Sequence, residues 1–218
     1  MNEHRWKKWR SWIEKSRDDL STLVDDKAVF TEFWKVVQQN QIWINSHEGG
    51  LFTDFIWRSY AASAIMGIRR HLKRGDRSIS LRSLLDEIWE DADQVTYDFY
   101  LSVLPPKETV PNWRKVTFKN LSEDGKTVSR CIICEDINQT KEINRRIEEI
   151  ADRLIAHLDP RGTERNVTDA ELANVIDNFN TIICKYDTFL SGEGRVTLES
   201  TVPGGWAKTF QYPFVKPA

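Results

Sequence analysis

The residues best suited to chemistry lie in the segment ADRLIAHLDP at 151–160. Arg153 and His157 are four residues apart, so on a helix their side chains are neighbours, with roughly 5–6 Å between Cβ atoms. Arg146 precedes His157 by eleven residues, which places it within about 20° of the same stripe. An imidazole that titrates near neutral pH can move a proton while a guanidinium stabilises a pentavalent phosphate. These three residues are our catalytic candidates for metal-independent RNA cleavage.

The same segment also has a purely structural interpretation. His157, in the last turn of a helix, can interact with the helix dipole and with Asp159. Arg153 can pair with Asp152 or Glu149. We count Asp152 and Asp159 as supporting residues of the site, and the spacing leaves both interpretations open.

A second candidate is the cationic segment at 67–82, which the formal net charge of −2 conceals. Cations near a helix C-terminus interact favourably with the dipole, so a solvated helix end is one explanation. Attraction of phosphates, which arginine can grip with two hydrogen bonds, is the other. The residues that we predict to contact nucleic acid are Arg69, Arg70, Lys73, Arg74 and Arg77.

Most other familiar mechanisms lack their residues in this chain. There is no GxxxxGK[ST], no GxGxxG after a strand, no HExxH and no GxSxG. Cys131 and Cys134 form a C-x-x-C that Cys184 and His157 could extend to a zinc site. The chain has no second such pair, and the two isoleucines between these cysteines favour buried thiols. We therefore expect no metal ion and no cofactor.

The composition favours a helical globular protein. The chain has 218 residues, 40% of them apolar and 29% charged, with nine Trp but only ten Gly and seven Pro. So few breakers argue against a sandwich or barrel, which needs a turn every ten residues or so. No apolar run approaches the ~18 residues that span a bilayer, and the charged N-terminus does not resemble a signal peptide. We expect a cytoplasmic protein that does not bind a membrane.

Apolar periodicity predicts an all-α bundle of about five to seven helices. The predicted helices cover 2–23, 27–39, 51–73, 80–91, 96–104, 136–158 and 168–190. The third follows a break at 47–50, and its N-terminal half is apolar nearly all round, so we expect it to be buried. Ser80 is a predicted N-cap, and Thr168 and Glu171 form a predicted capping box.

The remaining segments are less regular. Residues 105–135 are predicted to form an irregular loop or a small hairpin, with β-prone stretches at 115–118 and 127–134. The tail from Ser191 is predicted to be non-helical and extended. We expect one domain over 1–218, with its core at about 27–190 and the tail 191–218 packed on it. The aromatic residues expected to hold the tail are Trp206, Phe210, Tyr212 and Phe214.

Three strings together resemble the HEPN superfamily, and within it a poorly characterised bacterial branch related to abortive-infection (phage-defence) proteins. They are GIRRHLKRGDRSISLRSLLDEI at 67–88, ADRLIAHLDP at 151–160 and GWAKTFQYPF at 205–214. The resemblance implies a bundle of four or more helices, often homodimeric. In active HEPN ribonucleases, Arg and His from both subunits meet in a cleft at the dimer interface. Their motif usually has four to six residues between Arg and His, whereas three separate Arg153 from His157.

Two functions follow from these features. The first is a metal-independent RNA endonuclease of phage-defence or toxin type, with an antitoxin-type protein as a further partner. His157 would be its acid and base, Arg153 its phosphate stabiliser and Arg146 an auxiliary cation. The second is a non-catalytic helical module that binds a nucleotide, a nucleic acid or a protein.

Overall fold

The computed structural model describes residues 1–40, 42, 45, 47–73, 79–105, 112–156, 168–193 and 197–211. Within these ranges no strand occurs, and one isolated bridge joins Thr96 to Thr127. Two short 3-10 helices cover Ala92–Gln94 and Trp206–Gln211. The described residues form seven α-helices, which are α1 (Glu3–Gln39), α3 (His47–Leu72), α4 (Leu81–Asp91), α5 (Tyr97–Val103), α6 (Asn112–Lys119), α7 (Arg130–Ala156) and α8 (Asp169–Ser191). The predicted all-α class and helix number are confirmed.

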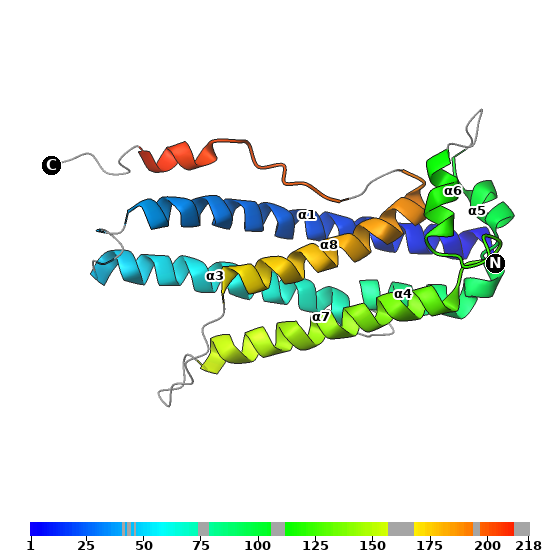
Figure 1. Cartoon of the computed structure of the whole chain (residues 1–218), viewed down its shortest axis with the longest axis horizontal. Coiled ribbons are helices and arrows are strands. Elements are labelled where there is room, and N and C mark those ends of the chain that lie inside the picture. The colour runs from blue at the N-terminus through cyan, green and yellow to red at the C-terminus, as the bar shows by residue number, and fades with distance from the viewer. Residues whose placement is uncertain are drawn as a thin grey trace.

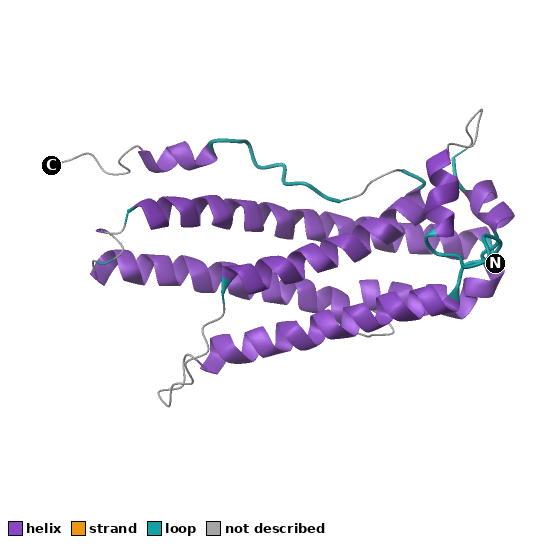
Figure 2. Ribbon diagram, viewed as in Figure 1, coloured by secondary structure: helices purple, strands orange, loops and turns teal. Residues whose placement is uncertain are grey.

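Four long helices run lengthwise and alternate in direction. In Figure 1, α3 returns beside α1, and α8 returns beside α7. The short helices α5 and α6 gather at the end that holds the N-terminus. Figure 2 shows that the described part of the chain consists of helices and loops, and residues 197–211 lie along α1. None of the described helices is long and apolar enough to cross a membrane.

Among the residues that the structure describes, two clusters of buried apolar side chains hold the helices together. The larger takes residues from all seven α-helices, including Trp6 and Trp9, so the core also contains residues before 27. Trp6 meets Phe189 edge to face with ring centroids 5.3 Å apart. The smaller cluster joins Phe30, Phe33 and Val37 of α1 to aromatic residues of α3. Such aromatic contacts contribute about 0.5–1.5 kcal/mol each beyond the area that they bury.

Helix α1 is longer than either predicted piece. The prediction of separate helices at 2–23 and 27–39 is wrong, because residues 24–26 contain neither Gly nor Pro and the helix continues through them. The predicted break at 47–50 is wrong as well, since these residues form the first turn of α3. Free backbone N–H groups are normal in a first turn, which tolerates glycine better than a helix interior does.

Helix α3 contributes to the larger buried cluster mainly through its C-terminal half. Ala61, Ile65 and Ile68 lie in the core as predicted. Leu51 and Phe55 are exposed, so the prediction that the N-terminal half is buried is wrong. In the described part of the chain, the neighbours of α3 are mainly α1, α7, α8 and α4. They leave the side chains of Leu51 and Phe55 exposed.

The segment 105–135 is more helical than its β-prone residues predict. Residues 115–118 belong to α6, and α7 already begins at Arg130. Arg114 and Phe118, four residues apart, are both buried, so tertiary packing selects the helical spacing over local β propensity. The short stretch between these two helices is a loop, in which Asp124 Oδ1 accepts hydrogen bonds from the backbone N–H of Lys126 (2.7 Å) and Thr127 (3.1 Å).

Both predicted caps are confirmed. Ser80 Oγ accepts from the backbone N–H of Ser83 at 3.1 Å, and α4 begins at the next residue, Leu81. Thr168 and Glu171 form the complete capping box, with hydrogen bonds of 3.2 and 2.9 Å. Each cap stabilises its helix by about 1 kcal/mol.

The tail packs on the bundle through polar and aromatic contacts. The Asp25 carboxylate accepts from Ser200 Oγ at 2.7 Å and from the Thr201 backbone N–H at 2.7 Å. These hydrogen bonds hold the pKa of Asp25 below its usual value. Trp206 packs against the smaller aromatic cluster, but it begins a 3-10 turn in a tail that was predicted to be non-helical. The side chain of Phe210, and all of Tyr212 and Phe214, lie outside the described residues.

Candidate functional site

Two of the three catalytic candidates, Arg146 and Arg153, belong to the C-terminal half of α7. This helix is amphipathic, with Ile143, Ile147 and Ile150 buried in the core. Arg146 stands beside that buried stripe with its side chain 45% exposed. Arg153 lies two turns further along α7, so its Cα lies close to the line of Arg146. The side chain of Arg153 and the whole of His157 and Asp159 lie outside the described residues.

A hollow of about 200 Å³ lies between α7 and α8 beside Arg146. Its charged lining consists of two arginines and two glutamates, so the charges of the lining balance. The lining residues are Arg145, Arg146, Glu149, Ile150, Glu171, Asn174 and Val175. A balanced lining can orient a polar ligand but does not concentrate anions as a uniformly basic cleft does.

The two arginines of this hollow are tied to neighbouring carboxylates. Arg146 Nε donates to Glu142 Oε1 at 3.0 Å, and Arg145 Nη2 donates to the same oxygen at 2.6 Å. Arg145 also pairs with Glu149 on the next turn. Hydrogen bonds from Arg145 and then Arg146 lower the pKa of Glu142 to about 2, so its carboxylate is charged at neutral pH. A phosphate that reaches Arg146 must compete with this carboxylate.

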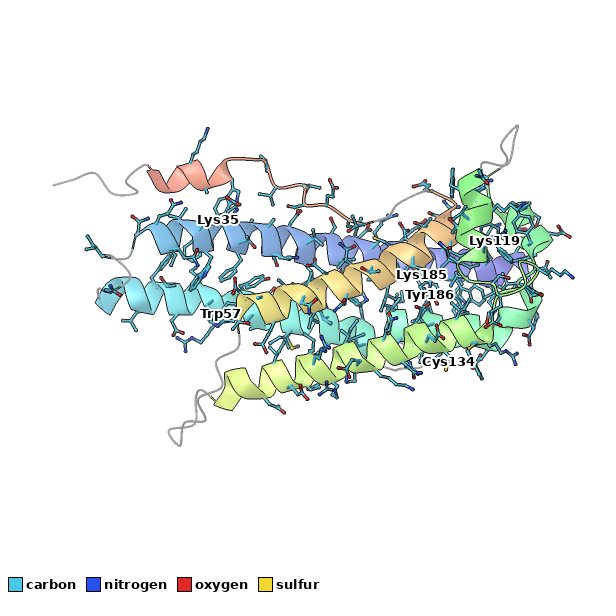
Figure 3. The ribbon with its side chains drawn as sticks, in the orientation of Figure 1. Lys35, Trp57, Lys119, Cys134, Lys185 and Tyr186 are labelled. Carbon is cyan, nitrogen blue, oxygen red and sulfur yellow. The ribbon has the colours of Figure 1, made fainter. Side chains whose placement is uncertain are left out.

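A buried polar network fixes α7 against α8. Asp136 is 4% exposed. Its Oδ2 accepts from Tyr186 OH at 2.6 Å and from Lys185 Nζ at 2.7 Å. Burial, followed by the nearby carboxylate, raises the pKa of Tyr186 well above its usual value, so the phenol remains a donor. Figure 3 shows Lys185 and Tyr186 on the part of α8 that faces α7. Neither partner of Asp136 was identified from the sequence, because fifty residues separate Asp136 from Tyr186.

The predicted nucleic-acid contacts do not gather at this hollow. Arg69 pairs with Glu148 of α7 at 3.0 Å, and Arg70 lies 3.7 Å from Asp19 of α1. Glu148 is about 160° around α7 from Arg146, so Arg69 contacts a different face of α7 from the one that carries Arg146. Lys73 and Asp152 are exposed, and Arg74 and Arg77 lie outside the described residues.

A second hollow, of about 300 Å³, lies beside the cationic segment and was not anticipated from the sequence. Among the described residues its lining contains no carboxylate. The lining residues are Leu72, Arg82, Thr140, Lys141 and Asn144. Arg82 is already engaged, because its guanidinium binds both oxygens of Asp86, at 3.2 and 3.0 Å, and the Ile137 carbonyl at 3.3 Å. Arg82 therefore holds α4 against α7 and leaves Lys141 as the less constrained cation.

A buried histidine lies between α3 and α1. His71 Nε2 is 3.0 Å from Asp19 Oδ2, while its buried Nδ1 has no hydrogen-bond partner. Burial lowers the pKa of His71, although Asp19 acts in the opposite direction. A neutral ring that donates from Nε2 fits this geometry, because a protonated ring would bury an unpaired N–H at Nδ1.

The cysteines are placed differently from the prediction. Cys131 and Cys134 are exposed, so the expectation of buried thiols is wrong for both; Cys184 is buried as expected. The reason is that α7 begins at Arg130, and positions three apart share its outward face. No group of three or more His, Cys, Asp and Glu side chains within the described ranges could hold a metal ion.

The resemblance to known proteins agrees with this architecture. The family model HEPN_AbiU2, described as AbiU2, matches residues 32–196, about three quarters of the chain. The match begins inside α1 and includes α3 to α8, and with them Arg146, Arg153 and His157. No curated protein and no solved structure matches the chain.

Proposed function

Because the chain belongs to the AbiU2 family of HEPN-like abortive-infection proteins, we propose that it defends cells against phage by cleaving RNA without a metal ion. The observation that carries this proposal is the half-exposed Arg146 on α7. The Cα of Arg153 lies on the same face of the helix, and His157 follows Ala156, the last residue of α7, in the sequence.

The proposed reaction needs one proton carrier and one anion stabiliser. The His157 imidazole accepts the proton of a ribose 2′-hydroxyl, and the 2′-oxygen attacks the adjacent phosphorus. The Arg153 guanidinium, with Arg146 beside it, stabilises the pentavalent phosphate. The P–O5′ bond breaks and the 5′-oxygen takes up a proton, which leaves a 2′,3′-cyclic phosphate and a 5′-hydroxyl. Asp152 and Asp159 support the site by orienting these cations.

The proposal includes a homodimer, a basic contact surface and a protein regulator. A second copy supplies a second His157, so one imidazole acts as the base and the other as the acid. The cations expected to hold the RNA backbone are Arg69, Arg70, Lys73, Arg74 and Arg77. An antitoxin-type protein would keep the activity in check.

The test is toxicity and RNA cleavage by the full chain and three variants. We expect expressed wild-type protein to arrest growth, and purified protein with EDTA to cleave a short single-stranded RNA. His157→Ala and Arg153→Ala should each lower the cleavage rate at least about a hundredfold. Arg10→Ala is the matched control, because Arg10 forms an ordinary exposed pair with Glu14 on α1. An RNA with a 2′-deoxyribose at the cleaved position should resist the wild-type protein.

Normal growth of cells that make abundant folded wild-type protein, with no cleavage in vitro, would refute the nuclease. The second candidate, a non-catalytic binding module, would then take its place. It is favoured by the lining of the hollow, in which Glu149 and Glu171 balance the charges of Arg145 and Arg146. Both arginines are also paired with Glu142. A module would bind RNA, a nucleotide or a protein with the same affinity in wild type and His157→Ala.

A further inference from the structure

Two cysteines lie on the surface at the N-terminal end of α7. Cys131 and Cys134 have the C-x-x-C spacing, and both are exposed, whereas Cys184 is buried. In Figure 3, Cys134 points outward from α7. Cys184 Sγ donates to Asn180 Oδ1 on its own helix at 3.1 Å. The two thiols of α7 are therefore the ones that a reagent in solution can reach.

The surroundings of these two thiols leave them available for reaction. Cys134 Sγ accepts one weak contact, from Asn138 Nδ2 at 3.9 Å. A structural zinc ion takes four ligands from the protein. Across the described ranges, the cysteines belong to no group of three or more His, Cys, Asp and Glu side chains that could hold a metal ion. A pair of thiols without further ligands is suited to thiol–disulfide exchange instead.

The spacing of the two cysteines is close to that of a disulfide. On an α-helix, residues three apart have Cα atoms roughly 5 Å from each other. This distance lies within the range of about 4.4–6.8 Å that a disulfide requires. The Cβ atoms of such residues are about 5–6 Å apart, whereas a disulfide brings them to about 3.5–4.5 Å. Closing the bond therefore requires the first turn of α7 to tighten by about 1–2 Å.

The first turn of α7 can tighten without disturbing the core. Backbone N–H groups in a first turn have no partner within their own helix. Here the backbone N–H groups of Cys131 and Ile132 donate to Ser129 Oγ at 3.2 and 3.4 Å, which is long for a hydrogen bond. The first fully buried side chain of the helix is that of Ile133. Cys131 can therefore move towards Cys134 while the buried residues stay in place.

We propose that Cys131 and Cys134 are a modification site, which low-molecular-weight disulfides oxidise reversibly to one intramolecular disulfide. The thiolate of one cysteine attacks a sulfur of the small disulfide, forms a mixed disulfide and releases one small thiolate. The thiolate of the other cysteine then attacks the protein sulfur of the mixed disulfide and displaces the second small thiolate. The two protein thiols lose two electrons to the reagent, and their protons leave with the two released thiols. This inference is independent of the proposed RNA cleavage.

The resulting disulfide should be easy to reduce. It closes a short loop, and a short loop constrains the unfolded chain less than a long one does. The Cβ atoms must also be drawn together against the geometry of the helix, which strains the folded state. Exposed and strained disulfides are the labile ones that exchange with small thiols. The site should therefore respond to the surrounding thiols and disulfides rather than stabilise the fold.

The first test is mass spectrometry of the folded full chain after treatment with excess glutathione disulfide. We expect the product to be lighter than the reduced chain by two hydrogen atoms, and dithiothreitol to restore the original mass. Cys131→Ser and Cys134→Ser should each gain one glutathione group instead, because a single thiol stops at the mixed disulfide. Circular dichroism checks that the wild type and the variants are folded during the reaction.

The second test separates the spacing of the cysteines from their exposure. Cys134→Ser combined with Asn138→Cys is the matched control, since Asn138 is exposed and lies on the same side of α7 as Cys131. Its two cysteines would be roughly 10 Å apart at Cα, too far for a disulfide, so we expect it to gain two glutathione groups. A wild type that also gains two groups, that does not react, or that links Cys184 or a second chain in peptide mapping would overturn the inference.

Discussion

Replacing Asp136 by alanine should be among the most destabilising single changes between α7 and α8. The carboxylate is 4% exposed, and its Oδ2 accepts from Tyr186 OH at 2.6 Å and Lys185 Nζ at 2.7 Å. Asp136→Ala leaves the fully buried Tyr186 hydroxyl without this acceptor. Hydrogen bonds to charged groups contribute about 1.5–3 kcal/mol each. The Lys185 bond counts for less, because its side chain is 28% exposed.

These contributions lead us to expect the free energy of unfolding to fall by about 3 kcal/mol. In a chain of 218 residues, that corresponds to a decrease in Tm of roughly 6–12 °C. The measurement is urea unfolding followed by circular dichroism at one fixed protein concentration, with an unchanged m-value as the sign that only stability has altered.

Two further variants make the measurement specific. Asp93→Ala is the control, since Asp93 pairs with Arg130 at 2.8 Å but is 68% exposed and should contribute at most about 1 kcal/mol. In a double-mutant cycle, Asp136→Ala and Tyr186→Phe should show a coupling of about 1–2 kcal/mol. A loss below about 1 kcal/mol for Asp136→Ala, or strictly additive effects in the cycle, would refute the reasoning.

Two other predictions concern a helix end and a buried ring. Thr168→Ala should lower the free energy of unfolding by about 1 kcal/mol, while Thr168→Ser should leave it nearly unchanged, because only the hydroxyl caps α8. Urea unfolding of the wild type and both variants measures the difference, and equal losses in the two variants would contradict the capping role. Burial lowers the pKa of His71 in the folded chain below the ordinary value of 6.5, so as the pH falls the imidazole of the unfolded chain is protonated first. The free energy of unfolding should therefore decrease as the pH drops from 6.5 towards the folded-state pKa. His71→Gln should flatten this part of the pH profile, and an identical slope in wild type and variant would exclude His71 as its source.

The parts of the fold that could be predicted from the sequence are those that depend on residues close together in the chain. Thr168 and Glu171, three residues apart, form a capping-box pattern that predicts the start of a helix. Ser80, which precedes an apolar i, i+3, i+4 pattern, predicts a second helix start. The continuity of α1 was not predicted, because its sequence contains two amphipathic stripes, each of the length of an ordinary helix. The absence of Gly and Pro between them was the available signal.

The parts that could not be predicted depend on distant residues. Residues 115–118 contain β-prone side chains, and only the packing of Phe118 against aromatic residues of other helices makes the segment helical. At the candidate site, periodicity identified the stripe of Arg146 along α7, but not the hollow beside it, because the other wall comes from α8. The apolar N-terminal half of α3 was assigned to the core, since hydrophobicity alone does not distinguish a side chain buried in a core from one exposed on a surface.

The length of α1 sets the smallest piece of this chain that could be made as a folded protein. With 37 residues, the helix is about 55 Å long. A fragment cut to the family match at residues 32–196 would retain less than a quarter of that length. It would lose Trp6, Trp9, Ile13 and Leu20, each 0–2% exposed in the intact chain, and would expose the surfaces of α4, α5 and α8 against which they pack. A fragment with the boundaries of the family match would therefore expose apolar surface and aggregate. A fragment that starts at Met1 would keep the whole of α1.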